Sequence, residues 1–266
     1  MSEFVYLETR KNFHPLAKVT AMSFSRRHIL GAAVLSPTLI VRPSMAAQPF
    51  YVSVRDELRL GALCWQAYAK EAGLSDTPQT LQVERYLGQV GGKMTHHLRR
   101  PMPYTFKLDP NPRYISACAY PGGLVITGGG ILSYADSEDA LAAVLGHEIM
   151  HCDLGHTTGR MEEEQKKHHL TDAQRNRIPV DDYGNTYSHD QELAADREGV
   201  KAAVAAGYSP YGMRRLFELF AFVGRDAKPR SGSLTIQTRM ARLDHLIAQY
   251  GWKHLKDSRT PLDVLP

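Results

Sequence analysis

Two histidines and a glutamate stand at HExxH spacing in the run LGHEIMHCDLGH, as His147, Glu148 and His151. Residues four apart on a helix lie about 40° apart around its axis, so both imidazoles can present nitrogens to one tetrahedral ion. Glu148 then lies beside that ion, where it can take a proton from water. The spacing predicts a zinc site able to hydrolyse peptide bonds, with Glu148 as the base.

The helix that carries this motif is expected to be buried on the side of the glutamate. Val144, Leu145, Ile149 and Cys152 form one apolar arc, and Glu148 falls roughly within it. An unpaired buried carboxylate is costly, whereas a nearby dication favours its ionised form. The pattern therefore favours a metal site over a chance coincidence of residue types.

A second acidic run, SHDQELAADREG, supplies the third ligand that a catalytic zinc needs. If residues 189–206 are helical, Glu192 and Asp196 lie on one face, followed by the small residues Gly199 and Ala203. We predict Glu192 as the third ligand of one Zn²⁺ and Asp196 as the acceptor of a ligand histidine N–H. The alternative is an ordinary solvated acidic face.

The motifs HEIMH, His156 and ELAAD followed by AGYSP resemble metallopeptidase family forty-eight, the family of the CAAX prenyl protease, HtpX and BepA. The similarity extends upstream through PYTFKLDPNPRYISACAYPGGLVITGGGIL and covers roughly residues 80–245. The resemblance implies a mainly helical α+β fold of the gluzincin type, with the two motif helices packed on a small antiparallel sheet. It also implies zinc endopeptidase activity. The sequence shows no internal repeats, so we expect no appended helical repeat domain of the kind that some relatives carry.

One position departs from that family. Its members often carry a His-Pro pair six residues before a late Arg, but Ser233 and Leu234 precede Arg239 here. Whatever that histidine contributes near the metal is therefore unassigned. Three side chains are open candidates to replace it, against an ordinary loop or helix role: Tyr183, Tyr187 and His189.

The N-terminal segment 1–46 predicts export. Arg26 and Arg27 precede a mainly apolar run of about 13 residues, too short to span a bilayer comfortably, and Ser44-Met45-Ala46 offers small residues at cleavage spacing. The paired arginines resemble a twin-arginine signal. We expect a cleaved signal and a periplasmic location, and the alternative is a membrane anchor. We also expect translation to start at Met22.

Charge and cysteines bound the remaining function classes. The chain holds 32 Lys and Arg against 28 Asp and Glu, but 26 of each lie beyond Ala46, so the mature segment is neutral. We therefore expect no nucleic-acid partner.

The three cysteines, Cys64, Cys118 and Cys152, leave at least one thiol unpaired within a monomer. We expect Cys152 to be a core residue.

Residues 47–266 are long enough for a single domain. Periodicity predicts helices near 48–70, 78–99, 137–158, 189–206, 209–224 and 236–250, and strands near 103–108, 113–119 and 123–127. Asp136 or Ser137 can cap the metal helix, and Gly207 can end the helix that bears Glu192.

Two segments have open interpretations. Residues 123–127 (GLVIT) form either an edge strand that pairs with a peptide substrate or a core strand. The polar stretch 159–188 forms either a lid or a solvated helix extension with a loop, and His168 and His169 within it are expected on the surface.

Two functional classes follow. The first is a periplasmic zinc endopeptidase that acts on misfolded or unassembled envelope proteins, a substrate class implied by the resemblance, with peripheral association with the envelope. The second is a latent or non-hydrolytic, chaperone-like binding protein that uses the same groove. The intact HExxH, Glu192 and Asp196 favour the first class, and the sequence leaves the oligomeric state open.

Overall fold

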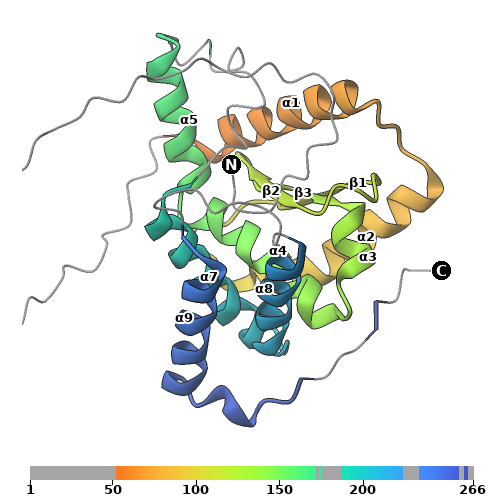
Figure 1. Cartoon of the computed structure of the whole chain (residues 1–266). Helices are drawn as coiled ribbons and strands as arrows, with labels where there is room; N and C mark the ends of the chain where they lie inside the picture. The colour runs from red at the N-terminus through yellow and green to blue at the C-terminus, as the bar shows by residue number, and fades with distance from the viewer. Residues whose placement is uncertain (1–51, 172–173, 175–186, 224–233, 258–260, 263–266) are drawn as a thin grey trace, which may run out of the picture.

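A computed structural model describes residues 52–171, 174, 187–223, 234–257 and 261–262. In this part of the chain, helices surround a small three-stranded sheet (Figure 1), which confirms the predicted mainly helical α+β class. The predicted export signal, Tyr183 and Ser233 lie outside the described residues, as does most of the second half of the polar stretch 159–188.

The sheet has the strand order β1-β3-β2 and is mixed. Its strands are β1 (Thr105–Asp109), β2 (Ala117–Tyr120) and β3 (Leu124–Gly128). β2 and β3 form an antiparallel hairpin, and β1 pairs parallel with the other side of β3. The expectation of an antiparallel sheet therefore holds for one of its two pairings and is wrong for the other.

β3 is the central strand, and every one of its residues is buried. A tight turn at Gly122 and Gly123 connects β2 to β3, and its φ angles of 79° and 70° favour glycine. Because β3 is paired on both sides, residues 123–127 form the core strand, and their interpretation as a peptide-binding edge is wrong. The outer strands of the sheet are β1 and β2.

The helices follow the predicted order, with one addition and one division. They are α1 (Val54–Ala72), α2 (Pro78–Gly92), α3 (Gly129–Tyr134), α4 (Glu138–Asp153), α5 (His156–Lys167), α7 (His189–Ala205), α8 (Tyr211–Val223) and α9 (Ile236–Gln249), with short 3-10 turns η1 (Thr95–His97) and η3 (Trp252–His254). Within the described ranges, none of these helices is both long and apolar enough to cross a membrane.

The predicted helix 137–158 is two helices, α4 and α5. They are separated at Gly155, which has a φ of 77° and so adopts the left-handed conformation that ends a helix. The other end of α4 is capped as predicted, because the Ser137 hydroxyl accepts from the Ala140 N–H at 3.3 Å. HExxH thus lies in the last two turns of α4, and His156 begins α5.

α4 is the central helix of the fold, and its residues 139–153 are all buried. It packs against β2, α2, α7 and α8. Gly146 of α4 and Gly199 of α7 meet where these helices cross, and a Cβ on Gly199 would lie only 2.9 Å from the Gly146 carbonyl carbon. The small residue predicted at Gly199 therefore sets the close approach of the two motif helices.

Glu138, the first residue of α4, accepts hydrogen bonds from three separate segments of the chain. Its carboxylate accepts from Tyr86 at 3.0 Å, from Tyr208 at 2.9 Å and from Lys93 at 3.3 Å. Burial alone raises the pKa of Glu138, but these donors outweigh it and hold the pKa below its usual value. The negative charge also lies at the positive end of the helix dipole.

The far end of α4 is fixed by a buried arginine. Arg100 donates from its backbone N–H to Asp153 at 2.8 Å and from Nε to Glu57 of α1 at 2.5 Å.

The start of α7 is fixed by a capping box between Ser188 and Gln191. It ends just before Gly207, whose φ is 92°, as the sequence predicts.

Candidate metal centre

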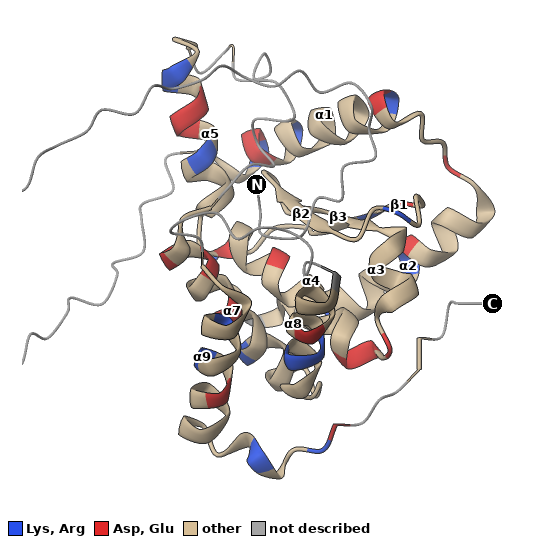
Figure 2. Cartoon of the chain, viewed as in Figure 1, with Lys and Arg blue, Asp and Glu red and all other residues tan. Residues whose placement is uncertain are grey.

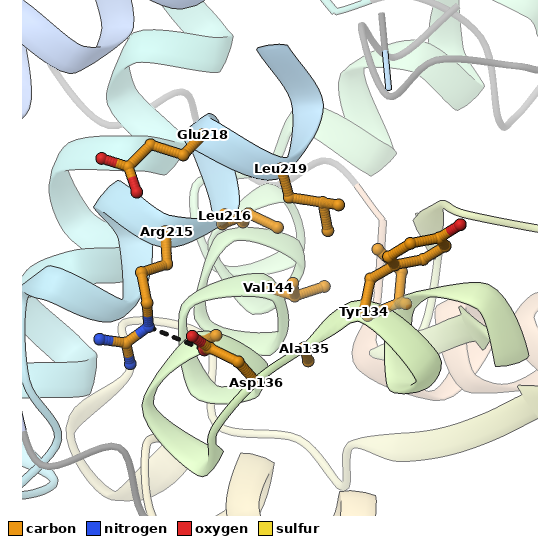
Figure 3. A pocket seen from close by; sticks show the side chains of 10 residues that line it. Tyr134, Ala135, Asp136, Val144, Arg215, Leu216, Glu218 and Leu219 are labelled. Carbon is orange, nitrogen blue, oxygen red and sulfur yellow. Dashed lines mark hydrogen bonds and ion pairs between the residues drawn. The ribbon is translucent and has the colours of Figure 1, made fainter. Parts of the chain in front are cut away.

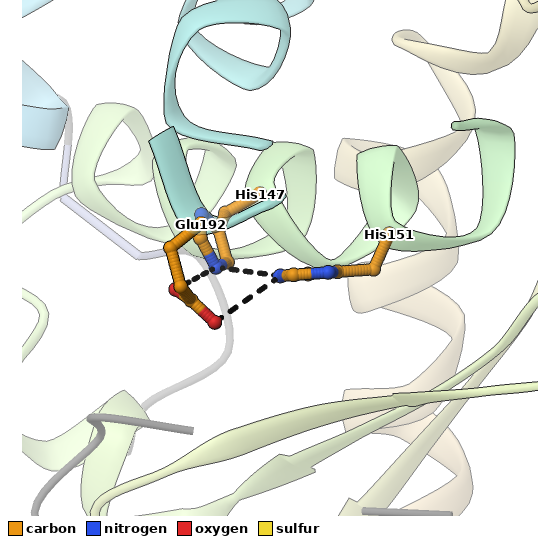
Figure 4. A group of neighbouring side chains, drawn as sticks. All are labelled: His147, His151 and Glu192. Atoms are coloured by element: carbon orange, nitrogen blue, oxygen red, sulfur yellow. Dashed lines mark hydrogen bonds and ion pairs between the residues drawn. The ribbon is translucent and has the colours of Figure 1, made fainter. Parts of the chain in front are cut away.

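His147, His151 and Glu192 converge on one point between α4 and α7 (Figure 4). One ligand atom from each lies within 4.8 Å of the others, and all three side chains are buried. The two histidine Nε2 atoms are 3.1 Å apart. Oε2 of Glu192 lies 3.4 Å from Nε2 of His147, and Oε1 lies 3.8 Å from Nε2 of His151. The structure thus brings together the three residues that the sequence proposes as ligands.

These three donors fit a zinc ion. Zinc bonds of about 2.0–2.2 Å to nitrogen and oxygen place tetrahedral ligand atoms about 3.3–3.6 Å apart, and the three observed separations bracket that range. Both carboxylate oxygens of Glu192 are buried and make no hydrogen bond of good geometry in the described part of the chain. Because such atoms are costly to leave unsatisfied, they favour a cation between the three side chains.

The protein groups hold Glu192 ionised and His147 protonated. Burial raises the pKa of Glu192, but His147, His151 and Arg239 outweigh it and bring the pKa to about 2. Burial lowers the pKa of His147, but its contacts with Asp196 and Glu192 raise the pKa to about 10. A metal ion must displace that proton from Nε2, so metal binding is expected to weaken as the pH falls.

Asp196 orients the side chain of His147, the first candidate ligand. Its Oδ1 lies 2.9 Å from Nδ1 of His147, so Nδ1 is the donor and Nε2 is left to face the metal position. Burial raises the pKa of Asp196, but Arg239 and His147 bring it to about 2. The carboxylate therefore stays ionised over the whole working pH range, as its predicted role requires.

Arg239 on α9 completes this arrangement. It is 2% exposed and donates to both oxygens of Asp196, from Nε at 2.7 Å and from Nη2 at 2.6 Å. Nη2 also lies 3.7 Å from Glu192, and the guanidinium stacks over Phe217 of α8 at 4.8 Å. The sequence singles out Arg239 by its spacing from Ser233 and Leu234. Local periodicity does not predict its contact with Asp196, because the two residues are 43 positions apart.

His156 orients the side chain of His151, the second candidate ligand. Its Nδ1 lies 3.0 Å from Nδ1 of His151, so the Nε2 atom of His151 faces His147 and Glu192. Burial lowers the pKa of His156 to about 4, so its imidazole is neutral and can accept from His151. The break between α4 and α5 at Gly155 brings His156 back over the metal helix.

Glu148 contacts the sheet as well as the neighbourhood of the candidate ligands. The carboxylate accepts from the backbone N–H of Ala119 on β2, on the side of β2 that does not pair with β3. Burial raises the pKa of Glu148, and the pKa reaches about 7 even though His147 lowers it. A carboxylate with this pKa can both take up and release a proton near neutral pH.

Tyr187 covers the side chain of His151. Its ring stacks on the His151 imidazole with centroids 3.8 Å apart and an interplanar angle of 19°. His189, another candidate to replace the missing late histidine, is exposed at the start of α7. His168 and His169 are exposed as expected, and Cys152 is a fully buried core residue whose thiol donates to the Tyr120 carbonyl at 3.4 Å.

A separate pocket of about 200 Å³ lies between α3 and α8 (Figure 3). It is lined by Tyr134, Val144 and Leu219 together with Arg215, which donates to Asp136 at 2.8 Å. None of the converging candidate ligand residues lines this pocket.

Acidic and basic residues are interspersed on the same helices (Figure 2), in keeping with the balanced charge of residues 47–266.

The fold and the His-His-Glu group define a metallopeptidase-like domain, and comparison with known families agrees. The family model Peptidase family M48 matches residues 81–175, which include HExxH and the strands before it. The resemblance to metallopeptidase family forty-eight is thereby confirmed.

Individual relatives are similar over less than half of the chain. The beta-barrel assembly-enhancing protease of Escherichia coli K12 is 30% identical over 121 residues, which make up 45% of this chain and 24% of that protein. The protein of the same name from Yersinia pestis is 31% identical over 121 residues, with the same coverage. The putative beta-barrel assembly-enhancing protease of Vibrio cholerae is 29% identical over 139 residues. The chain spans about a quarter of the length of these curated relatives.

Proposed function

We propose that this protein is a zinc-dependent metalloendopeptidase that hydrolyses misfolded or unassembled proteins of the cell envelope. The observation that carries the proposal is the convergence of His147, His151 and Glu192, with Glu148 one residue from the first ligand and turned toward a strand. The match to a peptidase family supports the reaction class. The names of the relatives support the substrate class.

His147, His151 and Glu192 would hold the zinc ion and leave one position open. The chemistry that bound zinc supplies is a water of lowered pKa and a polarised scissile carbonyl. Glu148 takes the proton of the attacking water on its carboxylate. It then delivers that proton to the departing amine.

The protein frame keeps these groups in position. Asp196 and His156 fix the ring orientation and tautomer of the two ligand histidines through their Nδ1 atoms. The buried guanidinium of Arg239 neutralises Asp196 and helps to balance the charge of Glu192. The site therefore needs no large rearrangement to present three ligands at once.

β2 is the strand that an extended substrate would meet. The backbone N–H and C=O groups of Ala117 and Ala119 point away from β3, because the Gly128 N–H donates to Ser116 and the register alternates from there. Ala119 already contacts Glu148, so a peptide beside β2 would bring its backbone to the base. This role replaces the one predicted for residues 123–127.

We place the enzyme in the periplasm on the basis of the predicted export signal in residues 1–46. Residues 47–266 form the single catalytic domain in this proposal. Its partners are unfolded proteins, with peripheral association at the envelope.

The test is cleavage of an unfolded reporter protein by the zinc-loaded chain, with Glu148→Gln measured in parallel. The parent should cleave, and the variant should bind the same zinc while losing turnover by at least about 1,000-fold. Glu163→Gln, which changes an exposed glutamate of α5, is the matched control and should behave as the parent. Equal cleavage by parent and Glu148→Gln would refute the base. No cleavage by either, despite bound zinc, would favour a latent or binding protein.

A further inference from the structure

The Tyr187 hydroxyl is a buried hydrogen-bond donor at the metal centre with no partner among the described residues. Its ring lies flat on His151, with centroids 3.8 Å apart, and 5.8 Å from the His156 ring. Both histidines are held in turn by the contact between their Nδ1 atoms. The ring is therefore fixed by stacking, and the hydroxyl has no role in holding it.

A tyrosine hydroxyl is protonated at neutral pH and is therefore available as a hydrogen-bond donor. Because the ring covers His151, whose Nε2 faces His147 and Glu192, the Tyr187 side chain lies beside the candidate metal position.

Three other polar side chains around the candidate ligands have contacts of their own. Arg239 donates to Asp196, His156 contacts His151, and Glu148 accepts from Ala119. A buried donor without an acceptor is unfavourable, and it is most readily explained by an acceptor that arrives with a ligand. In a peptidase, the acceptor that gains charge during the reaction is the oxygen of the scissile carbonyl.

We infer that Tyr187 is a catalytic residue whose hydroxyl donates to the scissile carbonyl oxygen as negative charge develops there. The inference rests on the proposed function and deepens it. It assigns to Tyr187 the stabilising role that no residue takes at the late His-Pro position. The residue forms no covalent bond and transfers no proton, so its contribution lies in the transition state.

Tyr187→Phe isolates the hydroxyl, because it retains the ring that stacks on His151. The matched control is Tyr104→Phe, which removes another buried hydroxyl without a hydrogen-bond partner in the described chain, one whose charged neighbours are Asp153, Glu57 and Arg100. We expect Tyr187→Phe to lower kcat by about 100-fold or more with little change in KM, and Tyr104→Phe to leave both constants unchanged. An unchanged or raised kcat in Tyr187→Phe would overturn the inference.

A binding measurement separates this inference from the proposed function. The probe is a peptide whose scissile amide is replaced by a phosphinate, and its Kd for the zinc-loaded full chain is measured by calorimetry. Tyr187→Phe should raise this Kd by about the same factor as it lowers kcat, while zinc content stays equal. Equal Kd values for parent and variant would overturn the role of Tyr187 even if the parent is active. An inactive parent that shows the Kd difference would refute the peptidase but retain the contact, and failure of the parent to bind the probe would overturn both.

Discussion

Replacement of Asp196 by Asn tests how the protein holds its first ligand. The change preserves the volume of the side chain and one oxygen facing Nδ1 of His147, but it removes the negative charge. Arg239, which is 2% exposed, then loses the carboxylate to which it donates twice, at 2.7 and 2.6 Å. A buried cation without its counterion is strongly unfavourable.

The size of the effect follows from these contacts. Loss of one partner of a buried ion pair costs about 3–5 kcal/mol, and for a protein of this size each kcal/mol lowers Tm by about 2–4 °C. We therefore expect the metal-free Asp196→Asn protein to unfold about 6–20 °C below the parent. Because the orienting partner of a ligand histidine is weakened, its zinc affinity should also fall by about 10–100-fold.

The assay is thermal unfolding with and without zinc, combined with competition for zinc against a chelator. Asp190→Asn, an exposed acid in the first turn of the same helix, is the matched control and should shift Tm by no more than about 2 °C. If Asp196→Asn matched the parent in both Tm and zinc affinity, the assignment of Asp196 and Arg239 as the support of the metal centre would be wrong.

Three further predictions concern the frame of the site. The depressed pKa of Glu138 means that its ionised carboxylate stabilises the folded state above the unfolded pKa of about 4.3. This stabilisation is lost as the pH falls through the lower folded pKa. Glu138→Gln should therefore lower the free energy of unfolding in urea by about 1 kcal/mol at pH 7 and by almost nothing at pH 2. Gly199→Ala should destabilise the protein by about 1–3 kcal/mol because its Cβ would press on α4, whereas Gly159→Ala, with open space around it, should not; equal urea midpoints would contradict the close crossing. His156→Ala should weaken zinc binding by about 10-fold in the chelator assay while chain folding, followed by circular dichroism, is retained; unaltered affinity would remove His156 from the support of His151.

The metal centre could be predicted from sequence wherever its residues follow helical spacing. His147 and His151 lie one turn apart on α4, and Glu192 and Asp196 lie one turn apart on α7, so each pair shares a face by helix geometry alone. Gly199 extends the second face and permits the close crossing of the two helices. Local periodicity is sufficient for such features because the relevant neighbours are three or four residues away.

The features that sequence reasoning missed depend on contacts between distant segments. Arg239 reaches Asp196 across 43 residues, and no local pattern on α9 distinguishes it from a surface arginine. The pairing of β1 with β3 is likewise set by packing, because the chain forms the β2–β3 hairpin beside an earlier strand. Gly155 itself signals the division, since glycine commonly ends a helix, but the apolar pattern continues past it and favours one long helix.

We propose that two histidines and one glutamate of this chain hold a catalytic zinc ion. The most direct measurement is the zinc K-edge X-ray absorption spectrum of the purified full chain, compared with that of Glu192→Gln. We predict one zinc per chain, with imidazole nitrogen and oxygen ligands at about 2.0–2.2 Å, and loss of zinc affinity in the variant. A sulfur ligand at about 2.3 Å, or a spectrum unchanged by Glu192→Gln, would contradict the proposed centre.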